Sequence, residues 1–264
     1  MARPFLKWVG GKRQLLPVLV NHVPKKFGTF HEPFVGGGAL FFSVMPKKAV
    51  LSDTNKRLIR TWLGVRNNVH DVIALLKTYP HTKKFFLSMR STEIDNKTDA
   101  EVAAWMIYLN KTAYNGLYRV NRSNIFNVPF GSYKNPAICD ENNLLACSEA
   151  LQDTEILHED FSKVLTRVRK GDFVYFDPPY VPLSATSMFT GYTAEGFGPE
   201  EQLRLRDVAL ELKRRGVKVL LSNSAAGLVR QIYSDNFEIE EVLASRHINC
   251  KAEGRSKITE LIMR

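Results

Sequence analysis

The tetrapeptide Asp177-Pro178-Pro179-Tyr180 directly follows an unbroken apolar run at residues 173–176. We expect this run to be a strand that is buried on both faces of a sheet. Two consecutive prolines fix the backbone and remove two N–H donors, so the turn is rigid and its carbonyl groups are unpaired. Open α/β sheets bind ligands at the carboxyl ends of their central strands. The tetrapeptide therefore predicts a small site with one carboxylate, one or two carbonyl oxygens and an aromatic face.

Such a site suits an exocyclic amine on a flat ring. The amino nitrogen of adenine is a poor nucleophile because its lone pair is delocalised into the ring. Two acceptors aimed at its N–H groups pull the nitrogen towards tetrahedral geometry, and the lone pair is then free to attack. We expect Asp177 and the carbonyl of Pro178 to be these acceptors and Tyr180 to stack on the ring. The alternative is a rigid turn that exposes an aspartate and a tyrosine by chance.

A glycine-rich turn lies nearer the N-terminus. Three glycines at residues 36–38 follow a predicted strand at 29–35, and Asp53 ends the next predicted strand. Glycines let a ligand approach the backbone closely, and an acid at the end of the following strand accepts hydrogen bonds from ribose hydroxyls. The alternative is an ordinary tight turn in which Asp53 caps the next helix. ATP hydrolysis is not expected, because the segment 9–13 lacks the first glycine and the hydroxyl residue of a phosphate-binding loop.

The elements that position these residues alternate between strand and helix at both ends of the chain. The middle is mostly helical, and its strongest helix start is a capping box formed by Thr98 and Glu101. We therefore predict an α/β fold with a doubly wound, Rossmann-like sheet formed by residues 1–54 and 146–264. A mainly helical domain is expected to be inserted into it at residues 55–145.

The overall charge indicates a polyanionic partner. The 264 residues include 37 Lys and Arg against 27 Asp and Glu, which gives a formal net charge of +10 and a pI of about 9.5. Nucleic acid is the first candidate for a partner of that charge. A hydrophobic content of 44% argues against intrinsic disorder and is enough for a sizeable core. No apolar run approaches the roughly 18 to 20 residues that span a bilayer, and no signal peptide is evident, so we expect a cytoplasmic protein without membrane contact.

Disulfides and metal sites are not expected. The three cysteines, Cys139, Cys147 and Cys250, form no Cys-x-x-Cys pair, and the six histidines are scattered. Neither a disulfide framework nor a zinc site follows from such a pattern. We also expect a monomer, because the sequence shows no coiled-coil heptad and no repeat.

Residues 111–137 combine basic, aromatic and amide side chains. The segment holds four basic residues, five aromatic residues and five Asn, but no Asp or Glu. This composition favours contact with nucleic acid over a polar surface loop with a few buried aromatic residues. An adenine inside a duplex must be rotated out before a small pocket can reach it, and aromatic and amide side chains can fill the gap that remains.

Seven motifs, taken in order, resemble those of the Dam-family DNA adenine N6-methyltransferases, which form the alpha group of the D12 class. The motifs are KWVGGK at 7–12, EPFVGGG at 32–38, Asp53, YNGLYR at 114–119, FNVPFG at 126–131, HEDF at 158–161 and DPPY at 177–180. Each motif alone is of limited specificity. Their order across nearly the whole chain is strongly specific, and it places a target-recognition insert between a cofactor-binding half and a catalytic half.

The resemblance implies that S-adenosyl-L-methionine donates a methyl group to adenine N6 in double-stranded DNA at GATC, after base flipping. It implies a methyltransferase-type sheet and no metal, because in-line transfer from a sulfonium needs orientation rather than a metal ion. The implied catalytic residues are Asp177, Pro178 and Tyr180. The implied cofactor-binding residues are Trp8, Lys12, Phe34, Gly36, Gly38, Asp53, Asp160, Phe161 and Asp177.

The resemblance also implies which residues contact DNA. Tyr114 would intercalate, Asn115 would hold the displaced region, and Arg119 would read a guanine edge with its planar fork. The complete implied set is Lys7, Tyr114, Asn115, Leu117, Arg119, Pro129 and Tyr133. Val120 and Ser132 depart from the residues that are common in the family next to this set.

Three further interpretations stay open at the level of sequence. Methylation of another planar amine, such as cytosine N4 or a protein glutamine, is an alternative, although Asp rather than Asn or Ser at position 177 favours adenine. A DNA-binding module that no longer turns over is the alternative from a different functional class. The segment 181–198, rich in Ser, Thr and Gly, is either a lid over the flipped base or a plain surface loop.

Overall fold

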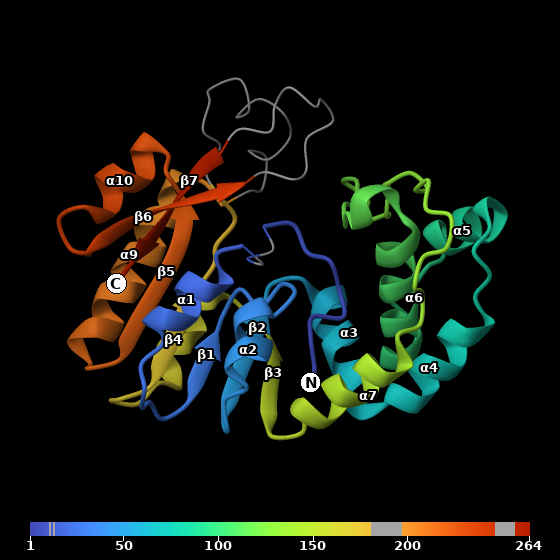
Figure 1. The fold of residues 1–264 in the computed structure, drawn as a ribbon, viewed down its shortest axis with the longest axis horizontal. Coiled ribbons are helices and arrows are strands. Elements are labelled where there is room, and N and C mark those ends of the chain that lie inside the picture. Colours follow the sequence, from blue (N-terminus) through green and yellow to red (C-terminus); the bar gives the residue numbers. More distant parts are fainter. Residues whose placement is uncertain (11, 13, 181–196, 246–256) are drawn as a thin grey trace. The chain divides into compact units, whose positions relative to one another are not determined.

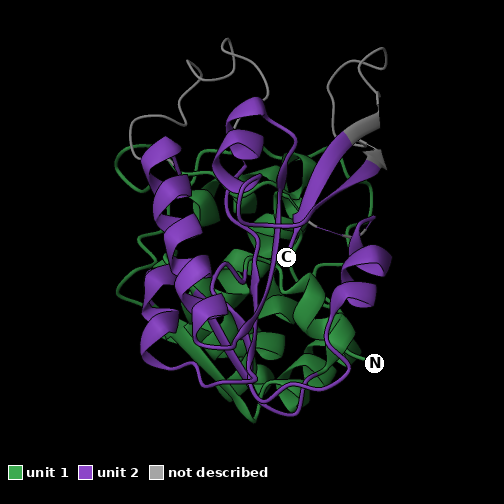
Figure 2. Cartoon of the chain, turned by 90° about the vertical axis from the view of Figure 1, so that its left-hand side faces the viewer, with its two compact units in different colours: residues 1–11, 36–45, 53–158 green, residues 12–35, 46–52, 159–264 purple. Residues whose placement is uncertain are grey.

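The computed structural model in Figure 1 describes residues 1–10, 12, 14–180, 197–245 and 257–264. The chain divides into two compact units, which Figure 2 colours separately. Unit 1 comprises residues 1–11, 36–45 and 53–158, and unit 2 comprises residues 12–35, 46–52 and 159–264. Each unit therefore combines segments that are far apart in the sequence. The possible lid at 181–198 lies outside the described residues except for its last two positions.

The mixed α/β fold predicted from the sequence is confirmed, and the described residues form seven strands. Unit 2 contains the strand order β2-β1-β4-β5-β7-β6. The bounds are β1 (Phe30–Glu32), β2 (Ala49–Asp53), β4 (Phe173–Phe176), β5 (Lys218–Ser224), β6 (Ile239–Ser245) and β7 (Lys257–Met263), and the last residue of β2 belongs to unit 1. Strands β2, β1, β4 and β5 are parallel, whereas β7 runs antiparallel to both β5 and β6. The carboxyl end of β4 thus lies between two parallel neighbours.

Strand β4 forms because all four of its side chains can be buried. Every residue from Phe173 to Phe176 is at most 1% exposed, as the unbroken apolar run predicted. The helices of unit 2 are α1 (Leu16–His22), η2 (Phe161–Thr166), α9 (Pro199–Arg214) and α10 (Gly227–Tyr233). Apolar side chains of η2, α9 and α10 share one core with β4, β5 and β7, and Figure 1 shows α9 and α10 beside these strands.

Unit 1 is organised around helix α6. Its elements are α2 (Ala39–Val44), α3 (Lys56–Asn67), α4 (Val69–Thr78), α5 (Lys83–Arg90), α6 (Asp99–Thr112), η1 (Tyr114–Gly116), α7 (Glu141–Ala150) and β3 (Thr154–His158). A Cβ atom on Gly64 of α3 would lie 2.3 Å from the carbonyl oxygen of Asp99, so α3 and α6 cross in direct backbone contact. The predicted capping box is present, since Thr98 and Glu101 each bind the other's backbone N–H. Within the described residues, no helix is long and apolar enough to cross a membrane.

The capping box gives a test of the fold. Substitution Thr98→Ala removes the side-chain acceptor at the start of α6 and should lower the free energy of unfolding by about 1 kcal/mol. Urea unfolding followed by circular dichroism measures this change. The matched variant Thr98→Ser keeps the hydroxyl and should stay close to the wild type. Equal stability of the Ala and Ser variants would contradict the assigned cap.

Candidate functional site

The carboxylate of Asp177 lies one residue beyond β4, at the carboxyl end of that strand. Its Oδ1 atom accepts Lys12 Nζ at 2.7 Å and Ser222 Oγ at 2.9 Å. The Lys12 side chain is 4% exposed and that of Asp177 is 20% exposed, so the pair is largely removed from water but still accessible. Burial raises the pKa of Asp177 above its ordinary value, and the Lys12 cation is the strongest opposing influence. The arrangement offers a partly desolvated carboxylate held against a buried ammonium group.

The ring of Tyr180 is fixed from two sides. Lys12 Nζ lies over the ring, 4.2 Å from its centroid, and the Tyr180 hydroxyl donates to Glu260 Oε2 on β7 at 2.5 Å. Burial, together with the negative charges of Asp177 and Glu260, raises the pKa of Tyr180 well above its ordinary value. Tyr180 therefore stays uncharged, which suits a stacking surface and not a general base. The turn thus holds the Asp177 carboxylate and the Tyr180 ring in defined positions on either side of the buried Pro178.

Sequence reasoning missed the residues that hold this turn from neighbouring strands. Ser222, at the end of β5, contacts Asp177, and Glu260 on β7 contacts Tyr180. The only sequence signal is the polar run Ser222-Asn223-Ser224 at the carboxyl end of an apolar strand, and all three residues are buried. Buried polar residues are seldom without hydrogen-bond partners, so such a run indicates that side chains at this strand end bind neighbouring segments.

Another part of unit 2 presents aromatic rings beside Asp160. Phe34 stacks on Phe161 with ring centroids 5.3 Å apart, and Phe197 meets Phe34 edge-on at 5.5 Å. Arg204 of α9 binds both carboxylate oxygens of Asp160 at 2.7 and 2.8 Å, and its guanidinium lies 4.2 Å from the Phe161 ring centroid. These bonds hold the pKa of Asp160 well below its ordinary value. Phe34, Asp160 and Phe161, all predicted cofactor residues, thus lie close together within unit 2.

Unit 1 contains the glycine turn and its acid. Asp53 Oδ2 accepts the N–H of Gly36 at 3.3 Å, and Oδ1 accepts the N–H of Asn55 at 2.9 Å. Burial raises the pKa of Asp53, whereas these two N–H groups oppose the shift. The capping alternative for Asp53 is wrong, because Asn55 is the N-cap of α3 and accepts the N–H of Leu58. Asp53 is therefore bound to the glycine turn, and its contact with a cofactor stays a prediction.

Two glycines in this turn cannot be replaced without strain. Gly36 and Gly38 have φ angles of 45° and 63°, in the left-handed region that favours glycine. A Cβ atom on Gly36 would lie 2.6 Å from the Trp8 ring, and one on Gly38 would lie 2.4 Å from Trp62. Trp8 in turn stacks on Tyr118, with centroids 5.5 Å apart and planes 20° apart. The predicted residues Trp8, Gly36, Gly38 and Asp53 therefore form one cluster within unit 1.

The predicted DNA-contacting residues all lie in unit 1, and none of them is buried. The exposed members are Lys7, Tyr114, Asn115, Arg119 and Pro129, whereas Leu117 and Tyr133 are half-buried. The N–H of Tyr114 donates to the carbonyl of Pro129 at 2.9 Å, which sets the two motifs side by side. Lys7 Nζ lies 5.0 Å from the Tyr133 ring centroid.

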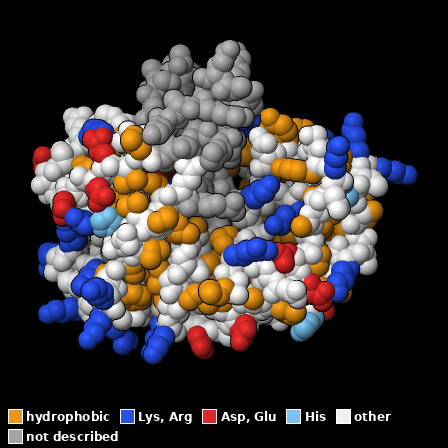
Figure 3. Space-filling view, in the orientation of Figure 1, with side chains coloured by type: hydrophobic (Ala, Val, Ile, Leu, Met, Phe, Trp, Pro, Cys, Tyr) orange, Lys and Arg blue, Asp and Glu red, His pale blue; other side chains and the backbone are white. Residues whose placement is uncertain are grey.

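Arg119 is held in a defined orientation. Its Nε donates to Asn127 Oδ1 at 2.7 Å, while the N–H of Asn127 donates to the Arg119 carbonyl at 3.0 Å. Arg119 Nη2 also donates to the Asn127 carbonyl at 3.4 Å, although the residue as a whole is exposed. Lys and Arg side chains are spread over the visible face in Figure 3 and do not gather in one patch. The prediction that residues 114–133 contact DNA therefore depends on their residue types and mutual contacts more than on a local concentration of positive charge.

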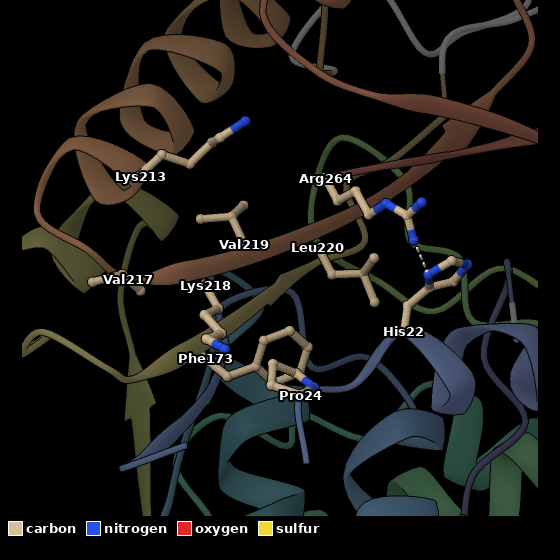
Figure 4. A pocket seen from close by; sticks show the side chains of 9 residues that line it. All are labelled: His22, Pro24, Phe173, Lys213, Val217, Lys218, Val219, Leu220 and Arg264. Atoms are coloured by element: carbon tan, nitrogen blue, oxygen red, sulfur yellow. Dashed lines mark hydrogen bonds between the residues drawn. The ribbon is translucent and has the colours of Figure 1, made fainter. Parts of the chain in front are cut away.

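A cavity of about 430 Å³ in unit 2 lies away from Asp177. Figure 4 shows Lys213, Lys218 and Arg264 around an apolar floor, with Arg264 bonded to His22 at 2.7 Å. Its lining residues Phe173 and Lys218 begin β4 and β5, whereas Asp177 lies beyond the opposite end of β4. The cavity is therefore separate from the candidate site. Within the described part of the chain, no group of three or more His, Cys, Asp or Glu residues is placed to hold a metal ion.

Comparison with known proteins agrees with this chemistry. Residues 8–248 match the model of the D12 class N6 adenine-specific DNA methyltransferase family. The chain is 46% identical to the type II methyltransferase M1.LlaDCHI of Lactococcus lactis subsp. cremoris, over 99% of this chain and 94% of that protein. It is 41% identical to the type II methyltransferase M.MjaIII of Methanocaldococcus jannaschii, covering 99% and 98% of the two chains. It is 34% identical to the DNA adenine methylase of Escherichia coli K12, covering 98% and 94%.

The Arg204–Asp160 pair gives a pH-dependent test. A carboxyl whose pKa is lower in the folded than in the unfolded state stabilises the fold above the unfolded pKa, and the contribution declines as pH falls from about 4. Substitution Asp160→Asn should therefore lower the free energy of unfolding at pH 7 by at most about 1 kcal/mol. The limit is small because the side chains of Arg204 and Asp160 are 40% and 35% exposed, so that water screens the ion pair. Urea titrations at pH 7 and below pH 4 measure the difference.

The matched control for this test is Asp207→Asn, which alters a carboxylate of α9 whose side chain is 64% exposed. Its effect should be smaller at pH 7. A destabilisation by Asp160→Asn that stays constant down to low pH would contradict the assigned ion pair.

Proposed function

Because this chain belongs to the D12 class N6 adenine-specific DNA methyltransferase family, we propose that it methylates the adenine of GATC in double-stranded DNA, after flipping that adenine out. The methyl donor of the family is S-adenosyl-L-methionine. The observation that carries the proposal is the Asp177 carboxylate, held by Lys12 at the carboxyl end of β4 and next to the Tyr180 ring. The family assignment confirms the resemblance drawn from the motifs and leaves the cytosine N4 and glutamine alternatives without support.

The reaction joins the N6 lone pair of adenine to a methyl carbon. S-adenosyl-L-methionine supplies this carbon on a sulfonium, which leaves as a neutral thioether. Asp177 and the carbonyl of Pro178 accept the two N–H groups of the amine and pull its lone pair out of conjugation. The nitrogen becomes positively charged as it is methylated, so a fixed carboxylate stabilises the transition state more than the ground state. The methylated nitrogen then loses one N–H proton to solvent, which gives neutral N6-methyladenine. Burial raises the pKa of the Asp177 carboxylate, and the Lys12 cation opposes the rise and so favours the ionised form.

The residues present fit S-adenosyl-L-methionine. In unit 1, the turn at Gly36 leaves room for no side chain, and the Asp53 carboxylate beside it is suited to accept hydrogen bonds from ribose hydroxyls. In unit 2, Phe34 and Phe161 offer flat apolar faces suited to an adenine ring. Each unit therefore carries part of the set that the family resemblance implies for the cofactor.

The same proposal assigns the exposed face of residues 114–133 to DNA. Tyr114 is 41% exposed although it is a large aromatic residue, which suits a side chain that fills the gap left by the flipped base. Asn127 orients the exposed Arg119 guanidinium by accepting from its Nε and Nη2 atoms, and such an oriented fork matches the O6 and N7 atoms of guanine. We further propose that the protein acts as a monomer in the cytoplasm.

The catalytic assignment is tested by substitution Asp177→Ala. It should abolish methyl transfer, because the amine loses its charged acceptor. The measurement is incorporation of labelled methyl from S-adenosyl-L-methionine into a duplex containing GATC and into a duplex in which the adenine is replaced. Asp207→Ala, which removes an exposed carboxylate, is the matched control and should retain activity. Appreciable transfer by Asp177→Ala would remove the catalytic role, and equal labelling of both wild-type duplexes would exclude GATC specificity.

The readout of sequence is tested by substitution Arg119→Ala. Discrimination at one guanine should fall by about 1 to 3 kcal/mol, because a bidentate contact to that base is lost. The measurement is kcat/KM on GATC and on duplexes with each base pair changed. The exposed neighbour Arg122 serves as the control: Arg122→Ala should weaken all sequences equally. A uniform loss for Arg119→Ala as well would make Arg119 a phosphate contact.

A further inference from the structure

A chain of three hydroxyl and carboxylate groups runs behind the catalytic turn. Tyr175 of β4 and Ser222 of β5 lie with their side-chain oxygens 2.8 Å apart, and Ser222 Oγ lies 2.9 Å from Asp177 Oδ1. Tyr175 is 1% exposed and Ser222 is fully buried. The parallel pairing of β4 with β5 ends at Phe176 and Leu221, and Asp177 and Ser222 are the residues that follow them on the two segments.

The carboxylate at one end of this chain fixes the direction of both hydrogen bonds. An ionised carboxylate only accepts hydrogen bonds, so the single hydroxyl hydrogen of Ser222 must point to Asp177. Ser222 Oγ can then only accept from Tyr175, whose hydroxyl must donate. Tyr175 keeps its proton, because burial and the nearby Asp177 charge raise its pKa well above the ordinary value. The chain therefore has one orientation, and its last donor ends on Asp177 Oδ1.

The same oxygen also receives the ammonium group of Lys12, at 2.7 Å. Two donors from different segments of unit 2 fix the rotamer of the carboxylate, and no hydrogen bond from a described residue is seen at Oδ2. We propose that Ser222, held by Tyr175, is a positioning residue that orients Asp177 so that Oδ2 accepts the hydrogen of the target amine. The inference rests on the proposed function and adds to it the atom that meets the substrate.

A purely structural role for Ser222 would require hydrogen-bond partners outside the catalytic turn. Its neighbour Asn223 shows what such a role looks like: its side-chain amide donates to Gln202 on α9 and its carbonyl accepts the N–H of Ser224. Both of those partners are scaffold groups. Ser222 instead donates to the carboxylate at the reacting centre, so its loss should change the behaviour of Asp177 itself.

The predicted change concerns both the rate and its dependence on pH. Removing a donor to the charged form raises the pKa of a carboxyl. Activity requires ionised Asp177 and is lost as pH falls through that pKa, so a higher pKa moves the acid limb to higher pH. The other titratable or charged groups that act on this carboxylate and on Tyr175 come from four elements or segments: Lys12, Glu32, Tyr180 and Glu260. The variants below leave these groups unchanged.

The experiment compares Ser222→Ala, Ser222→Thr and Tyr175→Phe with the wild type on a GATC duplex. We expect Ser222→Ala to lower kcat at least about tenfold, to leave KM for S-adenosyl-L-methionine within about twofold, and to move the acid limb of kcat upward. Tyr175→Phe should act in the same direction with a smaller change, and Ser222→Thr, which keeps the hydroxyl, should recover the wild-type pH profile. Tyr233→Phe is the matched control, because this buried tyrosine bonds to Gln202 and not to the turn.

Each outcome decides the inference. Unchanged kcat and an unchanged acid limb in Ser222→Ala would overturn it. A lower kcat with an unshifted acid limb would also overturn it, because a folding defect reduces the active fraction without altering the titration of Asp177. If thermal unfolding shows that Ser222→Ala does not fold, the acid limb of Tyr175→Phe decides in the same way. A wild-type protein that methylates no duplex would instead refute the proposed function, so the two failures are distinguishable.

Discussion

The contact between Lys12 and the Asp177 carboxylate is the interaction on which the rest of the site depends. Removing a charged carboxylate from water is costly unless donors replace the water. Lys12 and Ser222 supply such donors from two segments that are more than two hundred residues apart in the chain. Lys12 is positioned because its carbonyl accepts the N–H of Leu16 at the start of α1. The buried ion pair therefore ties the beginning of unit 2 to the ends of β4 and β5.

The remaining constraints on the turn come from the sheet. The two prolines stiffen the backbone after β4 but do not decide where the Tyr180 ring points. Glu260 does so by accepting the tyrosine hydroxyl, and Glu260 lies on β7, which pairs antiparallel with the polar end of β5 opposite Ser224. Antiparallel addition of β7 to a parallel sheet thus has a functional consequence. It delivers a carboxylate to the same sheet end at which the parallel strands deliver Asp177 and Ser222.

In unit 1, residues 113–134 contain little regular structure and must be stabilised in another way. Side chains and isolated backbone contacts replace the missing ladder hydrogen bonds. Arg57 of α3 binds Asp95 and the carbonyl of Asn124, and its guanidinium lies 5.5 Å from the Trp105 ring centroid. Asn110 of α6 donates to the carbonyls of Lys7 and Gly116. The exposed aromatic and basic side chains are therefore carried by a framework that hydrogen bonds from α3 and α6 hold in place.

Asp53 shows how a local signal and its context combine. The glycine turn and an acid some fifteen residues later were compatible both with a ligand site and with an ordinary helix cap. The structure excludes the cap, because Asn55 caps α3 and Asp53 instead accepts the N–H of Gly36, while the ligand site stays a prediction. Arg204 shows the opposite case, since no local signal connects it with Asp160, 44 positions away in the sequence, and yet it binds both oxygens of that carboxylate.

The sequence by itself determined the features whose physical cause is local. Proline fixes a backbone angle wherever it stands, left-handed turns require glycine, a capping box acts within one helical turn, and four consecutive apolar residues specify a doubly covered strand. The Asp-Pro-Pro-Tyr turn, the start of α6, strand β4 and the ordered motifs of the family all follow from such causes. Tertiary structure alone decided the partners: Ser222 for Asp177, Glu260 for Tyr180 and Arg204 for Asp160. These contacts join residues 44 to 80 positions apart, which strand register and helix packing bring together. The local sequence around a serine or glutamate on a strand does not indicate which distant residue it will bind.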